Sequence, residues 1–294
     1  MAQIASPVTI EIVGSLNMDL VTITSRMPRA GETMQANGFS AGYGGKGANQ
    51  AVACARLLRD THGEPTKNDI KVRIHGAVGL RDALGSEGYV DYLSKEGIDV
   101  SGVKRLEGVP TGCAVIIVEE ASGENRILIT PGANGEVQAS DVELDPNPDG
   151  FVLFQMEIPL KTVCSKTSSW LNCANIGIPQ TIGCIRQAKA MGKTVIVNVA
   201  PATVLPDEVY QGLDHLHVNE GEAAMLAGIA AEDVLDNVSK VGHFFRSKGV
   251  KNVVITLGGN GIYCLDAGGK EIRVSVIKCQ VVDTTAAGDT FAGG

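Results

Sequence analysis

Short apolar runs alternate along this chain with longer stretches in which apolar residues recur at helical spacing. The runs are rich in Val, Ile and Leu and predict strands at residues 8–13, 72–78, 151–155, 194–199, 215–219 and 253–257. The longer stretches predict helices at 46–59, 85–95, 160–171, 181–191 and 234–248. This alternation predicts an α/β fold with a mostly parallel central sheet, and ligands are expected where its strands end in loops.

Two segments, residues 20–41 and 113–130, break this alternation. Residues 113–118 and 126–129 are apolar except for Arg126, and they flank a Ser122-Gly123 turn, as in a β-hairpin. We expect both segments to pair into a separate small sheet. An exposed apolar sheet face promotes aggregation, which is a physical reason to expect a partner there.

The segment from Asp283 to Gly294 suggests phosphoryl-transfer chemistry. A predicted strand at 274–282 leads into the small residues Ala286, Ala287 and Gly288, whose backbone N–H groups can approach an anion at the start of a helix. Asp289 follows, where a carboxylate can take a proton from an attacking hydroxyl. The alternative reading is a glycine-containing turn with an aspartate helix cap.

Two further motifs place polar side chains beside glycines. Gly44 and Gly45 lack Cβ atoms and precede Lys46 and Asn49, which lie about one helical turn apart on one face. The spacing of a phosphate-binding P-loop is absent around Lys46, so this pair suggests recognition of hydroxyl groups.

The loop after the first predicted strand carries Asn17 and Asp19. These two side chains are suited to bind sugar hydroxyls. The alternative is a turn, because Asn and Asp both favour turns.

Taken together, the motifs GSLNMD at 14–19, GGKGANQA at 44–51 and DTTAAGDT at 283–290 resemble the ribokinase group of the PfkB carbohydrate kinase family. The resemblance extends over nearly the whole chain. It implies a ribokinase-like three-layer sandwich with a small β-sheet lid, formed by a single domain over residues 1–294. It also implies ATP-dependent phosphorylation of D-ribose at its 5-hydroxyl, giving D-ribose 5-phosphate and ADP.

The resemblance also assigns roles to residues at the sugar end of the site. Asp289 would be the base, and the anion hole would be formed by Ala286, Ala287 and Gly288. The sugar would be held by Asn17, Asp19, Gly45, Lys46, Asn49 and Glu157, with further contacts from Ala114, Ile116 and Ile129.

At the nucleotide end, the resemblance implies contacts from Thr256, Gly258 and Gly261, and from Ala287 and Gly288. Asn219 and Glu222 would organise magnesium and phosphate through water. The alternative for this pair is a helix cap, with Glu222 as a capping-box glutamate.

Asp283 and Thr285 match positions that supply a monovalent-cation site, normally for potassium, in the resembled family. The resemblance implies that segments beyond Gly294 complete the cation site and the adenine pocket, so the chain is expected to be truncated at its C-terminal end relative to the family. It further implies a homodimer formed through the lid.

Composition narrows the possible partners and compartments. The formal net charge is −8, and there is no basic cluster, which argues against nucleic acid or a membrane surface as a partner. The seven cysteines are scattered and include no Cys-x-x-Cys pair, which argues against a disulfide framework or a zinc site. We expect a reducing compartment, the cytoplasm, with the nucleus as an alternative. His215 and His217 are expected to pack or to lie at the surface.

Two other functions remain open from the sequence. One is a PfkB kinase for another sugar or a nucleoside, although the low aromatic content, 6 Phe, 5 Tyr and 1 Trp, argues against a site that stacks a nucleobase acceptor. The other is a sugar-binding form without turnover.

Overall fold

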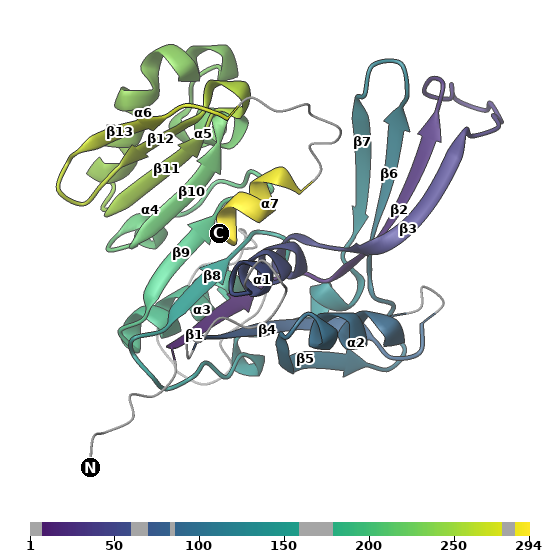
Figure 1. Cartoon of the computed structure of the whole chain (residues 1–294), viewed down its shortest axis with the longest axis horizontal. Helices are drawn as coiled ribbons and strands as arrows, with labels where there is room; N and C mark the ends of the chain where they lie inside the picture. The colour runs from purple at the N-terminus through teal and green to yellow at the C-terminus, as the bar shows by residue number, and fades with distance from the viewer. Residues whose placement is uncertain (1–7, 60–69, 83–85, 159–178, 278–285) are drawn as a thin grey trace.

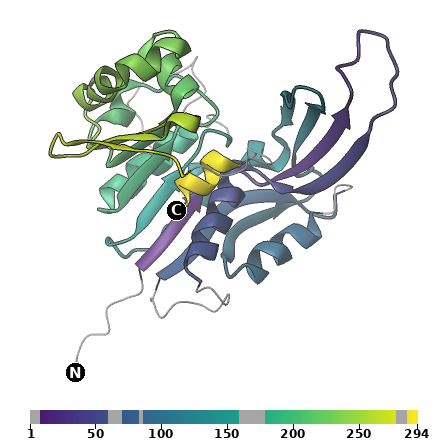
Figure 2. The same cartoon turned by 45° about the horizontal axis from the view of Figure 1, so that its top comes forward.

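The computed structural model describes residues 8–59, 70–82, 86–158, 179–277 and 286–294. Figure 1 shows a large twisted sheet flanked by helices and a small sheet that projects from one side of it. Turning the molecule shows the same small sheet extending away from the main body (Figure 2).

The large sheet has nine strands in the order β13-β12-β11-β10-β9-β8-β1-β4-β5. All pairings from β5 to β11 are parallel, whereas β12 and β13 are antiparallel additions at one edge. The strands are β1 (Val8–Val13), β4 (Ile70–Gly79), β5 (Asp99–Leu106), β8 (Phe151–Phe154), β9 (Thr194–Asn198), β10 (His215–Asn219), β11 (Asn252–Thr256), β12 (Ile262–Leu265) and β13 (Glu271–Val274).

Helices cover both faces of this sheet. One face packs α1 (Lys46–Leu57) and α2 (Glu87–Lys95), with α7 (Ala287–Ala292) beside α1. The other face packs α3 (Pro179–Ala190), α4 (Asp207–Tyr210), α5 (Glu220–Ala227) and α6 (Val234–Ser247). Short 3-10 turns are η1 (Gly132–Glu136), η2 (Ala139–Asp141), η3 (Ala231–Asp233) and η4 (Gly258–Asn260).

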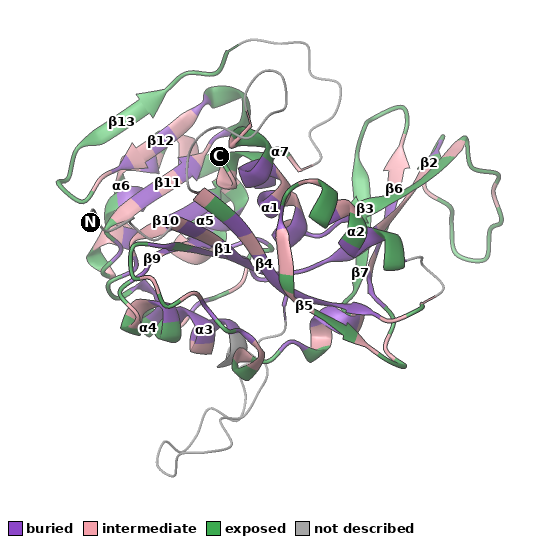
Figure 3. Ribbon diagram, turned by 60° about the horizontal axis from the view of Figure 1, so that its bottom comes forward, coloured by how far each residue is buried: buried purple, intermediate pink, exposed green. Residues whose placement is uncertain are grey.

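Alternation along the buried strands fills two separate cores. Ile12 of β1 belongs to the core under α1 and α2, and the next residue, Val13, belongs to the core under the helices of the opposite face. Because both faces are covered, the parallel strands are mostly buried (Figure 3), as their near-continuous apolar sequences predicted. The predicted α/β three-layer class is confirmed.

The small sheet has four strands in the order β3-β2-β6-β7, namely β2 (Asn17–Thr24), β3 (Gly38–Gly44), β6 (Gly112–Glu119) and β7 (Asn125–Thr130). The strands β6 and β7 form an antiparallel hairpin around the Ser122-Gly123 turn, and β2 pairs parallel to β6. We call this the lid sheet. Much of it is exposed, with the apolar Phe39 and Leu128 each 69% exposed.

Some sequence predictions fail in detail. The strand predicted at 274–282 is wrong in its described part, because β13 ends at Val274 and residues 275–277 are irregular. The strand β5 was not predicted because it lies at the sheet edge, is only half-buried and carries a mixed polar sequence. The predicted helix at 160–171, and Asp283 and Thr285 with it, lie outside the described residues.

The strand order fixes where a ligand site belongs. The sheet extends from β1 through β4 to β5 in one direction and from β8 to β11 in the other, so the order reverses between β1 and β8. In open α/β sheets, ligands bind outside the carboxyl ends of the strands at such a switch point. The loops that leave β1 and β8 begin with Gly14 and Gln155.

A buried ionic cluster ties β1 to β4 and to the start of β9. Glu11 Oε2 lies 2.9 Å from His75 Nε2, and Glu11 Oε1 lies 3.1 Å from Lys193 Nζ. Burial alone raises the pKa of Glu11, but the bonds from His75 and Lys193 outweigh burial and hold that pKa below its ordinary value. Lys193 Nζ also donates to the Asn147 carbonyl at 3.0 Å.

We predict that Lys193→Met lowers the free energy of unfolding by about 3 kcal/mol, because it leaves part of the Glu11 charge buried without its partner. The matched control is Lys251→Met, which removes an ion pair to Asp214 whose lysine side chain is 56% exposed. That variant should lose about 1 kcal/mol or less. Denaturant unfolding of both variants checks this, and equal losses would contradict it.

Candidate active site

Close backbone packing joins the loop after β1 to the start of α1. A Cβ on Gly47 would lie 2.6 Å from the carbonyl carbon of Gly14, so neither helix nor loop could keep its position with a larger residue there. Gly45, which begins the helix, has φ of 90°, a conformation that L side chains rarely adopt. These glycines therefore bring the first two motifs of the sequence together.

Glu157 anchors this junction. Its Oε2 accepts hydrogen bonds from Ser15 Oγ and from the backbone N–H of Lys46, the latter at 3.0 Å. Lys46 is the first residue of α1, where backbone N–H groups have no intrahelical acceptor and attract anions. Glu157 thus lies beside Lys46, one of the residues predicted to bind the sugar.

Asn17 is held by a second asparagine that the site predictions did not include. Asn134 Nδ2 donates to Asn17 Oδ1 at 2.8 Å and to the Leu16 carbonyl at 3.1 Å, while Asn134 Oδ1 accepts from Leu16 N–H at 2.9 Å. Both asparagines are buried. Asn134 belongs to the Pro131-Gly132-Ala133-Asn134 run, whose polar residue in a small-residue turn was the available signal.

Asp19 shares one face of the lid sheet with the three predicted apolar contacts. Its cross-strand neighbour on β6 is Ala114, whose neighbour on β7 is Ile129, and residues paired in this way point to the same face. Ile116 lies two residues after Ala114, so it also points to this face. Ala114 and Ile116 are buried, whereas Ile129 is 48% exposed.

Asp289 lies in the first turn of α7, and α1 holds both of its carboxylate oxygens. Asn49 Nδ2 donates to Oδ2 at 3.0 Å, and Gln50 Nε2 donates to Oδ1 at 3.0 Å. The first intrahelical bond of α7 runs from Thr290 N–H to the Ala286 carbonyl. The N–H groups of Ala287 and Gly288 therefore precede the hydrogen-bonded ladder and are available to an anion.

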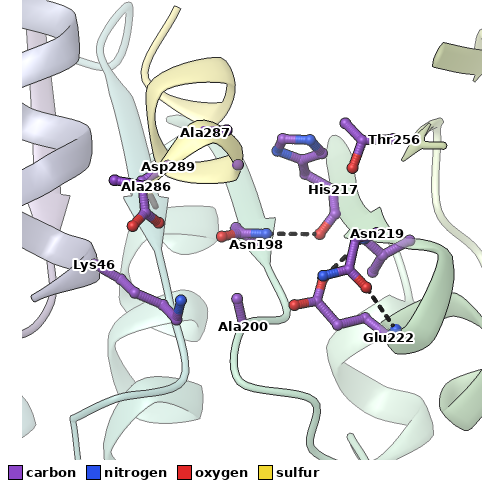
Figure 4. A pocket seen from close by; sticks show the side chains of 12 residues that line it. Lys46, Asn198, Ala200, His217, Asn219, Glu222, Thr256, Ala286, Ala287 and Asp289 are labelled. Carbon is purple, nitrogen blue, oxygen red and sulfur yellow. Dashed lines mark hydrogen bonds between the residues drawn. The ribbon is translucent and has the colours of Figure 1, made fainter. Parts of the chain in front are cut away.

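A cavity of about 220 Å³ opens beside Asp289 (Figure 4). Lys46 reaches into it from α1, opposite Glu222 and below the start of α7. The lining residues are Lys46, Asn198, Ala200, His217, Val218, Asn219, Glu222, Thr256, Ala286, Ala287, Gly288 and Asp289. Thus predicted sugar, phosphate and nucleotide contacts border one space.

The sequence missed Asn198, Ala200 and His217 as cavity residues. His217 was expected to pack or to lie at the surface; it is buried, and its ring packs 4.9 Å from the ring of Phe291. Burial lowers the pKa of His217 to about 4, so the imidazole is neutral at physiological pH.

Asn219 and Glu222 form the helix cap that was the alternative reading. Asn219 Oδ1 accepts from Glu222 N–H, and Glu222 Oε2 accepts from Asn219 N–H, each at 2.8 Å. The same residues border the cavity, so capping fixes the Glu222 carboxylate at its edge. Burial raises the pKa of Glu222 above its ordinary value.

Thr256 ends β11 and lines the cavity, whereas Gly258 and Gly261 form the turn that follows it. Gly261 has φ of 93°, and a Cβ there would lie 2.1 Å from the Val274 carbonyl oxygen. Glycine is therefore required for the chain to turn at this strand end. Neither glycine borders the cavity described above.

The predicted sugar end of the site concentrates negative charge. Burial, followed by the charges of Glu157 and Asp289, raises the pKa of Asp19 to about 6, and the charge of Lys46 partly offsets this. The charge of Lys46 also lowers the pKa of Glu222, against the effect of burial. The charge of Lys46 therefore lowers the pKa values of two carboxyl groups, Asp19 on the lid sheet and Glu222 at the cavity edge.

Metal binding by protein groups alone is not supported within the described ranges. No group of three or more His, Cys, Asp and Glu residues able to hold a metal ion occurs there. Magnesium, however, often binds through one or two carboxylates, waters and substrate phosphates. The Glu222 carboxylate at the cavity edge fits that requirement.

Comparison with known proteins agrees with this architecture. The model of the pfkB family carbohydrate kinases matches residues 9–294. A ribokinase of Schizosaccharomyces pombe is 41% identical over 293 residues, covering 97% of this chain and 83% of that protein. A deoxyribokinase of Salmonella typhi is 31% identical over 288 residues, with coverage of 97% and 83%.

Among solved structures, Arabidopsis thaliana ribokinase in complex with ribose and ATP is similar, with a TM-score of 0.75 and 30% identity. The similarity covers 98% of this chain and 84% of that one. The chain belongs to the PfkB family of carbohydrate kinases.

We predict that Asp19→Asn stabilises the sugar-free protein at about pH 8 by about 1–2 kcal/mol, because it removes an unfavourable charge. The direction of this change in stability follows from the raised pKa of Asp19. The carboxyl favours the folded state when protonated, and this contribution disappears as pH rises through about 6. Denaturant unfolding at about pH 8 and about pH 4 should show the difference shrinking at the lower pH.

Asp99→Asn is the control, and it should change the stability in the opposite direction. Burial raises the pKa of Asp99, but bonds from Ser101 and from Arg73 at 2.7 Å outweigh it and lower the pKa to about 2. Its contribution is present at neutral pH and is lost as pH falls through about 2, so Asp99→Asn should destabilise the protein at about pH 8. If both variants shifted stability in the same direction at that pH, the assignment for Asp19 would be wrong.

Proposed function

We propose that this chain transfers the γ-phosphoryl group of ATP to the 5-hydroxyl of D-ribose, giving D-ribose 5-phosphate and ADP. The observation that carries the proposal is the position of Asp289. Its carboxylate is held by α1, the helix that begins with the predicted sugar residues, and it borders the cavity that the α7 amides also line.

The sugar end offers groups that match a polyhydroxylated ligand. Asp19 and Glu157 supply acceptors, and Lys46 and Asn49 supply donors. Ala114, Ile116 and Ile129 share the lid face of Asp19 and offer apolar contact to the carbon skeleton. A sugar bound between them would lie within reach of Asp289 because Asn49 already contacts that carboxylate.

The chemical step then follows from the charges at this position. The ribose 5-hydroxyl oxygen forms a bond to the γ-phosphorus while the bond from that phosphorus to the β,γ-bridging oxygen breaks. Asp289 accepts the hydroxyl proton, and ADP leaves with the bridging oxygen. The Ala287 and Gly288 amides and Lys46 are suited to stabilise the charge on the transferring group.

Thr256, Gly258 and Gly261 are proposed to contact the nucleotide at the end of β11. Magnesium would neutralise the phosphate charges when bound, and Glu222 is the proposed residue that holds it through water. Potassium remains part of the proposal through Asp283 and Thr285. The cytoplasm is the proposed location, with the nucleus as an alternative.

We predict that Asp289→Ala lowers kcat for ribose-dependent ADP formation by at least about 100-fold, because it removes the general base. Ribose affinity measured by calorimetry should change little, since the other proposed sugar residues remain. Asp236→Ala, on the exposed start of α6, is the control and should behave as the parent protein. Turnover by Asp289→Ala near the parent rate would refute the assignment.

The same assay distinguishes the alternatives. Ribose, 2-deoxyribose, fructose and adenosine should be compared as acceptors with the parent protein, in magnesium and potassium. A higher kcat/KM for an acceptor other than ribose would show that the proposed substrate is wrong and the proposed kinase activity is right. Binding of ribose without ADP formation would favour the sugar-binding alternative.

We also propose a homodimer formed through the lid sheet. Its strands expose apolar side chains on both faces: Leu128 is 69% exposed, and the adjacent Ile127, which points to the opposite face, is 49% exposed. A monomer that left both faces uncovered would carry an unusual apolar surface. A second copy of the sheet would cover it.

We predict that Leu128→Asp or Ile127→Asp weakens dimerisation by at least about 100-fold, because each would bury an unpaired charge in the interface. Val204→Asp is the matched control, since Val204 is an apolar residue 70% exposed outside the lid. Analytical ultracentrifugation over a range of concentrations measures the effect. If neither lid variant differs from Val204→Asp, the interface lies elsewhere.

A further inference from the structure

A chain of buried amide side chains leads from the ends of β8 and β9 to Asp289. Gln155 Nε2 donates to Gln50 Oε1, and Gln50 Nε2 donates both to Asp289 Oδ1 and to Asn198 Oδ1, each at 3.0 Å. Asn198 Nδ2 then donates to the His217 carbonyl at 3.2 Å. Gln50 and Gln155 are fully buried, and Asn198 and Asp289 are each 6% exposed.

The His217 carbonyl fixes the orientation of these amide side chains. A carbonyl only accepts hydrogen bonds, so Asn198 must present its NH₂ group to His217 and its oxygen to Gln50. Gln50 must then present its NH₂ group to Asn198, and the second hydrogen of that group points to Asp289. With Gln50 reversed, its oxygen would face both the Asn198 oxygen and the Asp289 carboxylate, which is repulsive.

This orientation of the amides is unfavourable at Gln155. Gln155 Oε1 is buried and has no hydrogen-bond partner in the described part of the chain. Turning the Gln155 amide over would bring two oxygens together at Gln50 Oε1, because the direction set at His217 leaves Gln50 no donor on that side. The network thus leaves one oxygen unsatisfied and still delivers an N–H donor to Asp289.

We propose that Gln50 is a positioning residue that fixes the orientation of Asp289, so that Oδ2 is the oxygen that accepts the proton of the acceptor hydroxyl. This inference rests on the proposed function. Gln50 holds Oδ1 from the protein interior, where no substrate competes for its amide. Asn49 holds Oδ2 from the partly exposed side and is itself a predicted sugar contact, so substrate can exchange with it.

Other charges around Asp289 do not replace this bond. Asp19 and Glu222 repel its charge, as the reciprocal effects on their own pKa values show. Glu157 lies on the sugar side, and His217 is neutral at physiological pH. Lys46 supplies the positive charge lining the cavity, but it sits one turn earlier on α1 and is assigned to the transferring group.

The test uses Gln50→Met, which keeps side-chain length and removes the amide. We expect kcat for ribose phosphorylation to fall about 10- to 100-fold through loss of base orientation, with KM for ribose changed less than about threefold. The same variant with unchanged kcat would overturn the proposal.

Gln155→Met is the matched control, because it removes an equally buried glutamine amide and leaves the Gln50–Asp289 bond. It should lose stability comparably but keep a kcat well above that of Gln50→Met. Equal kinetic effects in both variants would show only a structural role and would overturn the proposal.

A measurement of stability, which does not need turnover, tests this inference separately from the proposed function. If the parent protein does not phosphorylate ribose, the proposed function fails, and a double-mutant cycle between Gln50→Met and Asp289→Ala in denaturant unfolding still tests the contact. Coupling between the two sites supports the positioning role. Additive effects would overturn it.

Discussion

The close approach of Gly14 and Gly47 is the constraint on which the candidate site depends. It seats the first turn of α1 against the end of β1 at the switch point of the sheet. Only with the helix in this position can the Lys46 N–H reach Glu157, and Gln50 reach both Gln155 and Asp289. The absence of two Cβ atoms therefore determines a set of polar contacts that extends across the site.

The site gathers acidic groups against their mutual repulsion. Asp19, Glu157 and Asp289 come from three separate parts of the chain, and burial raises the pKa of Asp19 further. The fold offsets this repulsion with the positive start of α1, the Lys46 side chain and the amides of Asn49 and Gln50. A site that holds carboxylates in this way is poised to bind hydroxyl groups, because they donate the hydrogen bonds that carboxylates lack.

Much of the fold could be predicted because buried parallel strands have near-continuous apolar sequences. The ranges of β1 and β10 matched the prediction, and so did the turn of the β6–β7 hairpin. The edge strand β5 could not be recognised, because half-exposure removes the apolar signal. The strand predicted at 274–282 is wrong at residues 275–277, because an apolar sequence alone does not supply a neighbouring strand to pair with.

The site residues also divide into those that the sequence could predict and those that it could not. Residues with a glycine-rich or acidic signature, such as Lys46 and Asp289, could be found from the sequence and border one cavity. Asn134 was missed although its small-residue turn gave a local signal, and Gln50 and Asn198 were missed because a buried amide has no local pattern of its own. Its role depends on partners far along the chain, 239 residues away for the Gln50–Asp289 bond.

The spacing of the GGKGANQ motif has a physical meaning in this structure. An α-helix turns by about 100° per residue, so Asn49 and Gln50 project in different directions and reach the two oxygens of one carboxylate. Lys46, about one turn earlier, points into the cavity. One inserted or deleted residue in this turn would rotate the later side chains away from Asp289. The same change would turn the buried face, Ala48, Ala51 and Cys54, out of the core beneath α1. The proposed sugar contacts, the proposed orientation of the base and the packing of the helix therefore depend on a single register.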